Sequence, residues 1–133
     1  MEQNKQQLQL QMISQQVELV QDQIKTLQEQ EKHLELTINT LNQFAKTKVG
    51  SETYVSLGTG IFTKAEIKEN QKLLVNVGAG IVVEKDIEST KELVNEQLNE
   101  IAKVSLQLST DLQKLLIEAN KIETCLGSHA SQN

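Results

Sequence analysis

One short motif occurs twice in the middle of the chain, between two long heptad segments. It reads Leu57-Gly58-Thr59-Gly60-Ile61 and, twenty residues later, Val77-Gly78-Ala79-Gly80-Ile81. Runs rich in Val, Ile and Thr flank each copy, and a Gly-x-Gly step supplies the positive φ angles that a tight hairpin turn needs. The motif therefore predicts two linked β-hairpins over residues 53–85.

Both flanking segments carry apolar residues at alternating steps of three and four, which predicts a left-handed coiled coil. In the N-terminal segment, a predicted helix over 1–49, these residues are Leu10, Ile13, Val17, Val20, Ile24, Leu27, Leu34, Ile38, Leu41 and Ala45, with Glu31 as the one interruption. In the C-terminal segment, a predicted helix over 86–126, the same positions hold nine apolar residues and the polar Ser105: Val94, Leu98, Ile101, Ser105, Leu108, Leu112, Leu115, Ala119, Ile122 and Leu126.

Local sequence signals predict where the second helix begins and ends. Asp86 or Ser89 can cap its start, and Ser89 with Glu92 would form a capping box. Gly127 and the polar residues after it predict a flexible tail over 127–133.

The two segments have similar lengths, which favours an antiparallel coiled coil within one chain. The predicted fold is therefore mainly α with a small β module: two helices joined by two hairpins. Four strands this short expose their edges and bury little alone. We expect the hairpins to pair with strands of other subunits, through Val55, Leu57, Gly58, Gly60, Ile61, Val75, Val77, Gly78, Gly80 and Ile81.

Composition narrows the function classes. A formal charge of −5 and a pI near 5.1 argue against binding to nucleic acid, which needs clustered basic residues. No apolar run approaches the roughly 20 residues of a membrane span, so no membrane partner is expected. The single cysteine, Cys125, excludes an internal disulfide and fits the reducing cytoplasm.

The sequence offers little for catalysis. Neither glycine pair has the third glycine of a dinucleotide fingerprint or the Gly-Lys-Ser/Thr of a P-loop, so no nucleotide cofactor is expected. His33, His129 and Cys125 have no partners at ligand spacing, so we expect no metal. The chain is predicted not to be an enzyme.

Some apolar residues lie off the heptad stripe, where an isolated two-helix coil should be polar. They are Leu8, Met12, Leu19, Leu106, Leu116 and Ile117. Either they contact a neighbouring helix, or those near the free end form an adaptable apolar surface for a partner. The flexible thioether of Met12 suits the second role.

The central stretch Val55–Ile67, matched by Val75–Lys85, and the two flanking coils resemble prefoldin, in particular the alpha class of the archaeal type. The resemblance extends over nearly the whole chain. It implies an ATP-independent chaperone in which two alpha and four beta subunits join through their strands into a β-barrel body. The coiled-coil tips would hold unfolded polypeptides and deliver them to a group II chaperonin.

The family resemblance does not specify which tip residues would contact clients, so we choose them from the apolar residues near the free ends. The candidate client-binding residues are Leu8, Leu10, Met12, Ile13, Leu116, Ile117, Ile122 and Leu126. The main alternative is a coiled-coil scaffold or tethering protein, because the stripe of the first segment also suits a parallel dimer.

Overall fold

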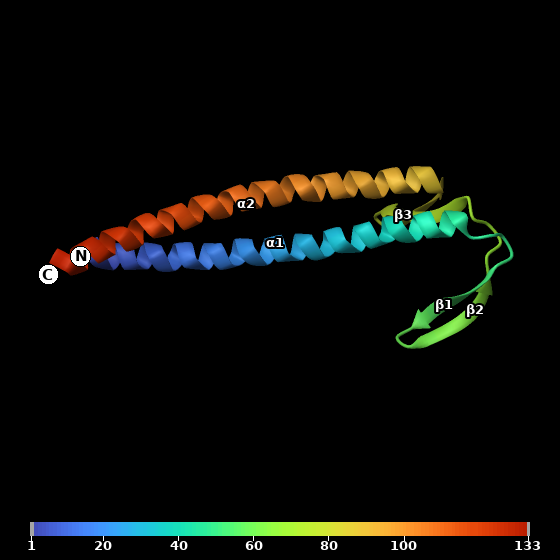
Figure 1. Ribbon diagram of the computed structural model, residues 1–133, viewed down its shortest axis with the longest axis horizontal. Coiled ribbons are helices and arrows are strands. Elements are labelled where there is room, and N and C mark those ends of the chain that lie inside the picture. Colours follow the sequence, from blue (N-terminus) through green and yellow to red (C-terminus); the bar gives the residue numbers. More distant parts are fainter. Residues whose placement is uncertain (1, 133) are drawn as a thin grey trace. The chain divides into compact units, whose positions relative to one another are not determined.

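The computed structural model describes the backbone of residues 2–132 and the side chains of residues 3–127. Two long helices enclose four strands in the chain order (Figure 1). The elements are α1 (Glu2–Lys46), β1 (Glu52–Gly58), β2 (Ile61–Glu66), β3 (Lys72–Gly78), β4 (Ile81–Asp86) and α2 (Ile87–Gln132). The predicted fold class, two helices joined by two hairpins, is confirmed.

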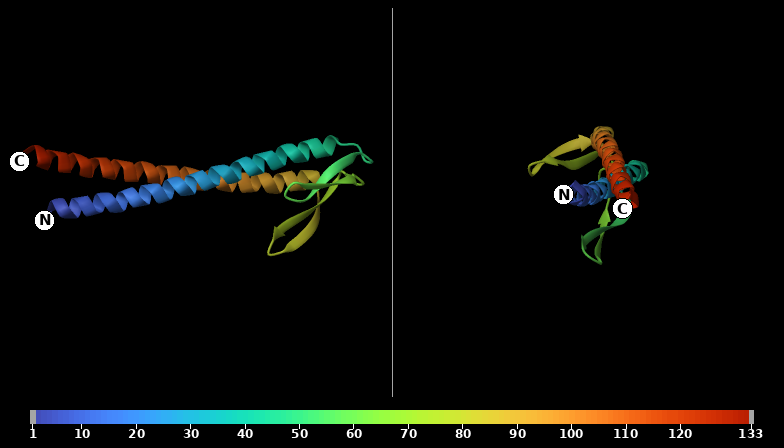
Figure 2. Two further views of the ribbon diagram at one scale, coloured as in Figure 1. Left: turned by 90° about the horizontal axis from the view of Figure 1, so that it is seen from below. Right: turned by 90° about the vertical axis from the view of Figure 1, so that its left-hand side faces the viewer.

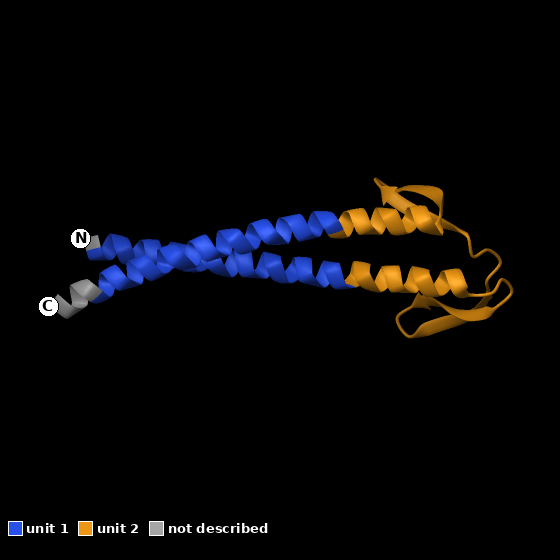
Figure 3. Ribbon diagram, turned by 45° about the horizontal axis from the view of Figure 1, so that its top comes forward, with its two compact units in different colours: residues 1–32, 99–133 blue, residues 33–98 orange. Residues whose placement is uncertain are grey.

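The chain divides into two compact units, coloured separately in Figure 3. Unit 1 holds the outer parts of both helices, Met1–Lys32 and Asn99–Asn133. Unit 2, His33–Leu98, holds the inner ends of the helices and both hairpins. In unit 1 the two helices run antiparallel and side by side, as the views of Figures 1 and 2 agree.

The heptad stripe forms the contact between the helices. Every predicted stripe residue of both helices is half-buried or buried, including Glu31, whereas most of the positions between them are exposed. The most buried side chains lie in unit 2, in the last turns of α1 and the first turns of α2. They are Leu41, Ile87, Thr90 and Val94.

The hairpins are two separate antiparallel ladders, β1 with β2 and β3 with β4. Each ladder has one extra residue just before its turn, Leu57 in the first and Val77 in the second. In the second turn, Gly78, Ala79 and Gly80 all have positive φ, at 118°, 53° and 73°. Two consecutive positive φ values, at Ala79 and Gly80, are typical of the type I′ hairpin turn.

Hydrogen bonds tie the hairpins to the helix ends within unit 2. The Asn70 side-chain amide donates to the Thr47 carbonyl over 2.8 Å, and the Gln71 carbonyl accepts from the Ile87 amide over 3.1 Å. Paired bonds between Gly50, Ser51 and Ile67 extend the first ladder toward α1. These bonds satisfy backbone groups that the short connections would otherwise leave without partners.

Two predicted helix boundaries are wrong. The first helix ends at Lys46 rather than at residue 49, and the chain then turns through Gly50, whose φ is 92°. The second helix does not stop at Leu126 but continues through Gly127 to Gln132. A glycine in a helix costs only about 1 kcal/mol relative to alanine, and no proline follows to end the helix. Asn133 lies outside the described residues, and the flexibility of 127–133 stays a prediction.

Of the two candidate caps for α2, the structure uses Asp86. Its Oδ1 accepts a hydrogen bond from the Ser89 backbone amide over 2.7 Å. This bond, followed by one from the Ser89 hydroxyl and by the charge of Lys85, lowers the pKa of the Asp86 carboxyl against a small opposing effect of burial. Asp86 is therefore the N-cap residue, and the capping box starting at Ser89 does not form.

The capping bond predicts a pH-dependent contribution to stability. Because the pKa of Asp86 is lower in the folded protein, its contribution is complete above the ordinary aspartate pKa of about 4 and is lost as the pH falls through the lowered value. Asp86→Asn keeps a capping oxygen but cannot titrate. We expect the difference in melting temperature between the wild type and D86N to shrink between pH 7 and pH values well below about 4, measured by circular dichroism. A constant difference would contradict the capping role of the carboxylate.

Alanine substitutions of the two glycines in the first turn should differ in their effect on stability. Gly60 has a φ of 75°, whereas Gly58 lies outside the left-handed region, so the predicted need for positive φ is wrong at Gly58. A Cβ at either position meets no atom within 4 Å, so only backbone strain distinguishes them. Gly60→Ala should lower the free energy of unfolding by about 1–2 kcal/mol, and Gly58→Ala by much less. Urea unfolding of the two variants measures the difference, and equal losses would rule out this explanation.

Candidate functional site

The hairpins expose most of their apolar side chains. Nine large apolar strand residues are exposed, with Leu74 the most open at 78%. They form what we call the strand surface: Tyr54, Val55, Leu57, Ile61, Phe62, Leu74, Val77, Ile81 and Val82. Because each sheet has only two strands, one edge of every strand also lacks a ladder partner. Exposed apolar patches and open strand edges are typical of surfaces that bind other chains.

The apolar residues of each hairpin occupy both faces. In the second hairpin Val75 lies opposite Val83 on one face, and Leu74 and Val82 lie on the other. In the first hairpin Tyr54 and Phe62 share a face, and Val55 lies on the opposite one. Strands that are apolar on both faces are typical of sheets covered on both sides. The hairpins therefore have the composition of interior strands, although the chain leaves the first open on both faces and covers the second only partly, on the face of Val75 and Val83.

The predicted assembly residues fall into two groups. Five of the six apolar ones are exposed, and Val75 is half-buried. Gly60, Gly78 and Gly80 lie at the turns with positive φ, while Gly58 ends β1. Sequence reasoning missed four members of the strand surface: Tyr54, Phe62, Leu74 and Val82. The strand alternation contained their signal, since each lies one position from a residue that was chosen.

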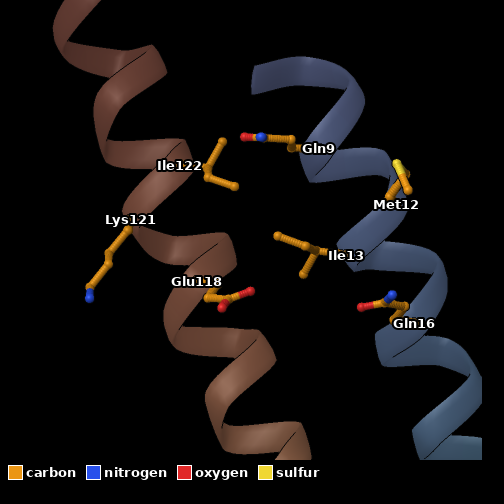
Figure 4. Close-up of a pocket in the computed structure, with 7 residues that line it drawn as sticks. All are labelled: Gln9, Met12, Ile13, Gln16, Glu118, Lys121 and Ile122. Carbon is orange, nitrogen blue, oxygen red and sulfur yellow. The ribbon is translucent and has the colours of Figure 1, made fainter. Parts of the chain in front are cut away.

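A second group of exposed apolar residues lies in unit 1, in the first turns of α1 and in the middle of the α2 part of that unit. Leu8, Met12, Leu116 and Ile117 are exposed, by 59%, 55%, 48% and 56%. We call these four residues the helix-end surface. The other predicted client-binding residues, Leu10, Ile13, Ile122 and Leu126, are half-buried in the seam. Figure 4 shows Ile13 and Ile122 directed into the space between the two helices.

Two of the remaining candidate positions are simple surface residues. Cys125 is a free, exposed thiol, and His33 is exposed. The side chain of His129 lies outside the described residues. Within residues 3–127, no group of three or more His, Cys, Asp and Glu side chains is placed to hold a metal ion.

Among the described residues, no helix is both long and apolar enough to cross a membrane.

The sequence is similar to those of known proteins. The Prefoldin subunit family model matches residues 13–130. Prefoldin subunit alpha of Archaeoglobus fulgidus is 28% identical over 114 residues, which cover 86% of this chain and 83% of that protein. Prefoldin subunit alpha of Methanosarcina mazei is 32% identical over 88 residues, or 66% of this chain and 62% of that protein.

A solved structure shares the fold. The cryo-EM structure of filamentous PFD from Methanocaldococcus jannaschii superposes with a TM-score of 0.79, covering 86% of this chain and 95% of that chain. At 17% sequence identity, this similarity concerns the fold of the two proteins.

Substitutions in the strand surface should prevent assembly without unfolding the chain. Leu74 and Val82 are 78% and 56% exposed in the chain, so their truncation removes little of its own packing. We expect Leu74→Ser combined with Val82→Ser to dissociate the assembly with unchanged helix content, because these side chains would be buried only against another chain. Size-exclusion chromatography with light scattering, together with far-ultraviolet circular dichroism, measures both properties.

Leu106→Ser is the matched control, since Leu106 is 70% exposed but lies on α2 in unit 1. It should assemble like the wild type. Intact assembly in the double strand variant would show that this face of the second hairpin is not an interface.

Proposed function

Since this chain belongs to the prefoldin subunit family, as an alpha-class subunit, and is thereby a chaperone subunit of a hetero-oligomer, we propose that it holds unfolded polypeptides without ATP and delivers them to a group II chaperonin. The clients would bind at the helix-end surface. The observation that carries the proposal is the exposure of four large apolar side chains in unit 1. An unfolded chain presents many apolar segments, and exposed apolar side chains gain free energy by removing them from water.

The helix-end surface suits clients of varied sequence. Leu8, Met12, Leu116 and Ile117 are flexible or aliphatic, with no aromatic side chain among them. A methionine thioether adapts its shape to irregular apolar surfaces. Such a surface binds weakly at each contact, and several copies in one assembly would add avidity. Weak, repeated contacts also allow release, which delivery to a second chaperone requires.

Independence from ATP is supported by the role of the central glycines. Gly60, Gly78 and Gly80 have the positive φ angles of hairpin turns. The hairpin geometry thus accounts for both Gly-x-Gly motifs without a bound phosphate. No Gly-Lys-Ser/Thr sequence follows either motif.

For the assembly, we propose two alpha and four beta subunits joined through the strand surface into a β-barrel body. The open edges and the doubly apolar faces of the hairpins support strand pairing with other subunits. The free thiol of Cys125 is in keeping with a place in the reducing cytoplasm. The alternative, a scaffold with extended arms that pair between chains, does not fit unit 1, where α1 packs against α2 of the same chain.

The test is a variant with serine at Leu8, Met12, Leu116 and Ile117. We expect at least about tenfold weaker binding of a chemically denatured client, because each lost side chain removes apolar contact area, with the assembly intact. Suppression of client aggregation, measured by light scattering with and without ATP, reports both the binding and its independence from nucleotide.

A control that replaces Leu36 and Leu106 by serine removes exposed apolar area elsewhere, at 63% and 70% exposure, and should hold clients normally. Transfer of a fluorescent client to a purified group II chaperonin tests delivery. Unchanged aggregation suppression by the four-serine variant would show that clients bind elsewhere.

A further inference from the structure

A groove runs along one side of unit 1 between α1 and α2. Three hollows make it up. The first and second share Gln16 and Glu118 as lining residues, and the second and third share Leu19. The groove extends from Gln9 and Ile122 at one end to Thr26 and Val104 at the other. We call it the unit 1 groove.

The groove repeats along its length with the period of the coil. Its apolar floor consists of stripe residues spaced by seven in each helix: Ile13, Val20 and Leu27 of α1, and Leu108, Leu115 and Ile122 of α2. Met12 and Leu19, also seven residues apart, add an exposed apolar rim on the α1 side. This rim lies off the stripe, so the packing of α1 against α2 does not account for it.

Three carboxylates and two lysines, Lys114 and Lys121, line the groove. Figure 4 shows the Glu118 carboxylate pointing from α2 toward α1, near Ile13 and Gln16, whereas Lys121 points away from α1. Asp111 lies seven residues before Glu118 and also lines the groove, and its Oδ1 accepts a hydrogen bond from the Gln107 amide over 3.0 Å. Residues spaced by seven share a helix face, so Lys114 shares the face of Lys121.

The acidic residues of unit 1 outnumber its basic residues. Asp22 adds a third carboxylate at the inner part of the groove. Unit 1 as a whole contains nine acidic and six basic residues, so its surroundings do not neutralise the groove. A ligand that combines apolar side chains with positive charge fits this lining better than a neutral or acidic one.

We propose that the unit 1 groove binds amphipathic helical segments of clients whose apolar stripe is flanked by lysine or arginine. This inference rests on the proposed holding function and specifies the class of segment held. An amphipathic helix lays residues at i, i+3, i+4 and i+7 into an apolar groove of matching period. From residue 9 to residue 26 the groove spans about 25 Å, or nearly five helical turns of a ligand. The groove shares Met12 with the helix-end surface, whereas Leu8, Leu116 and Ile117 do not line it.

The test compares two fluorescent peptides of about five helical turns with the same apolar stripe. One carries lysine and the other glutamate at the flanking positions, and fluorescence anisotropy measures their binding to the complete hetero-oligomer. We expect the lysine peptide to bind more tightly, with a preference that falls as salt is added. Glu118→Gln should weaken its binding about two- to fivefold, and adding Asp111→Asn should weaken it further by a similar factor.

Glu123→Gln is the matched control. It removes the same charge from the same helix, but Glu123 does not line the groove. Binding of the lysine peptide by this variant should equal that of the wild type. Equal affinity for the two peptides, or equal losses in E118Q and E123Q, would overturn the inference.

Two parallel measurements separate the possible causes of failure. A photo-crosslinking residue at Gln16 should capture the lysine peptide, whereas capture of another subunit of the complex would show that a neighbouring helix occupies the groove and overturn the inference. Suppression of client aggregation is measured on the same samples. A complex that suppresses aggregation but shows no peptide preference refutes the groove alone, and one that suppresses nothing refutes the proposed holding function.

Discussion

The apolar seam between α1 and α2 is the contact on which the rest of this molecule depends. It is one layer of mostly aliphatic side chains, and among the described residues no side chain is fully buried. A seam this narrow suffices to hold two long helices together, because each heptad adds a similar increment of buried area. The side chains outside this seam, on the flanks of the helices and on the strands, are mostly exposed.

The hairpins, like the seam, bury little apolar area within the chain. The first hairpin is exposed on both faces, whereas the second exposes one face and is half-buried on the other, at Leu73, Val75 and Val83. An isolated pair of strands is marginally stable at best. In the proposed assembly the strands would gain the missing burial from other subunits, so that folding of this region and assembly would stabilise each other.

In unit 1 the heptad positions outside the seam are available for binding other molecules. The seam uses two of the seven heptad positions, and the others are free to vary without loss of the fold. The helix-end surface places apolar residues at some of these free positions, and the unit 1 groove combines an apolar rim with carboxylates at others. Both surfaces lie on exposed flanks of the helices, and several copies in one assembly would add avidity.

The sequence by itself determined the two helices, the two hairpins, the seam and the family resemblance, because heptad spacing and Gly-x-Gly turns act locally. Only the tertiary structure decided that Asp86 rather than Ser89 caps α2, that α2 passes Gly127, and that Gly60 rather than Gly58 takes the strained turn position. It alone also showed Tyr54, Phe62, Leu74 and Val82 exposed on the strands, and Glu118 facing α1 while Lys121 faces away. These outcomes depend on which neighbours surround a side chain in space, and a periodic pattern does not contain that information.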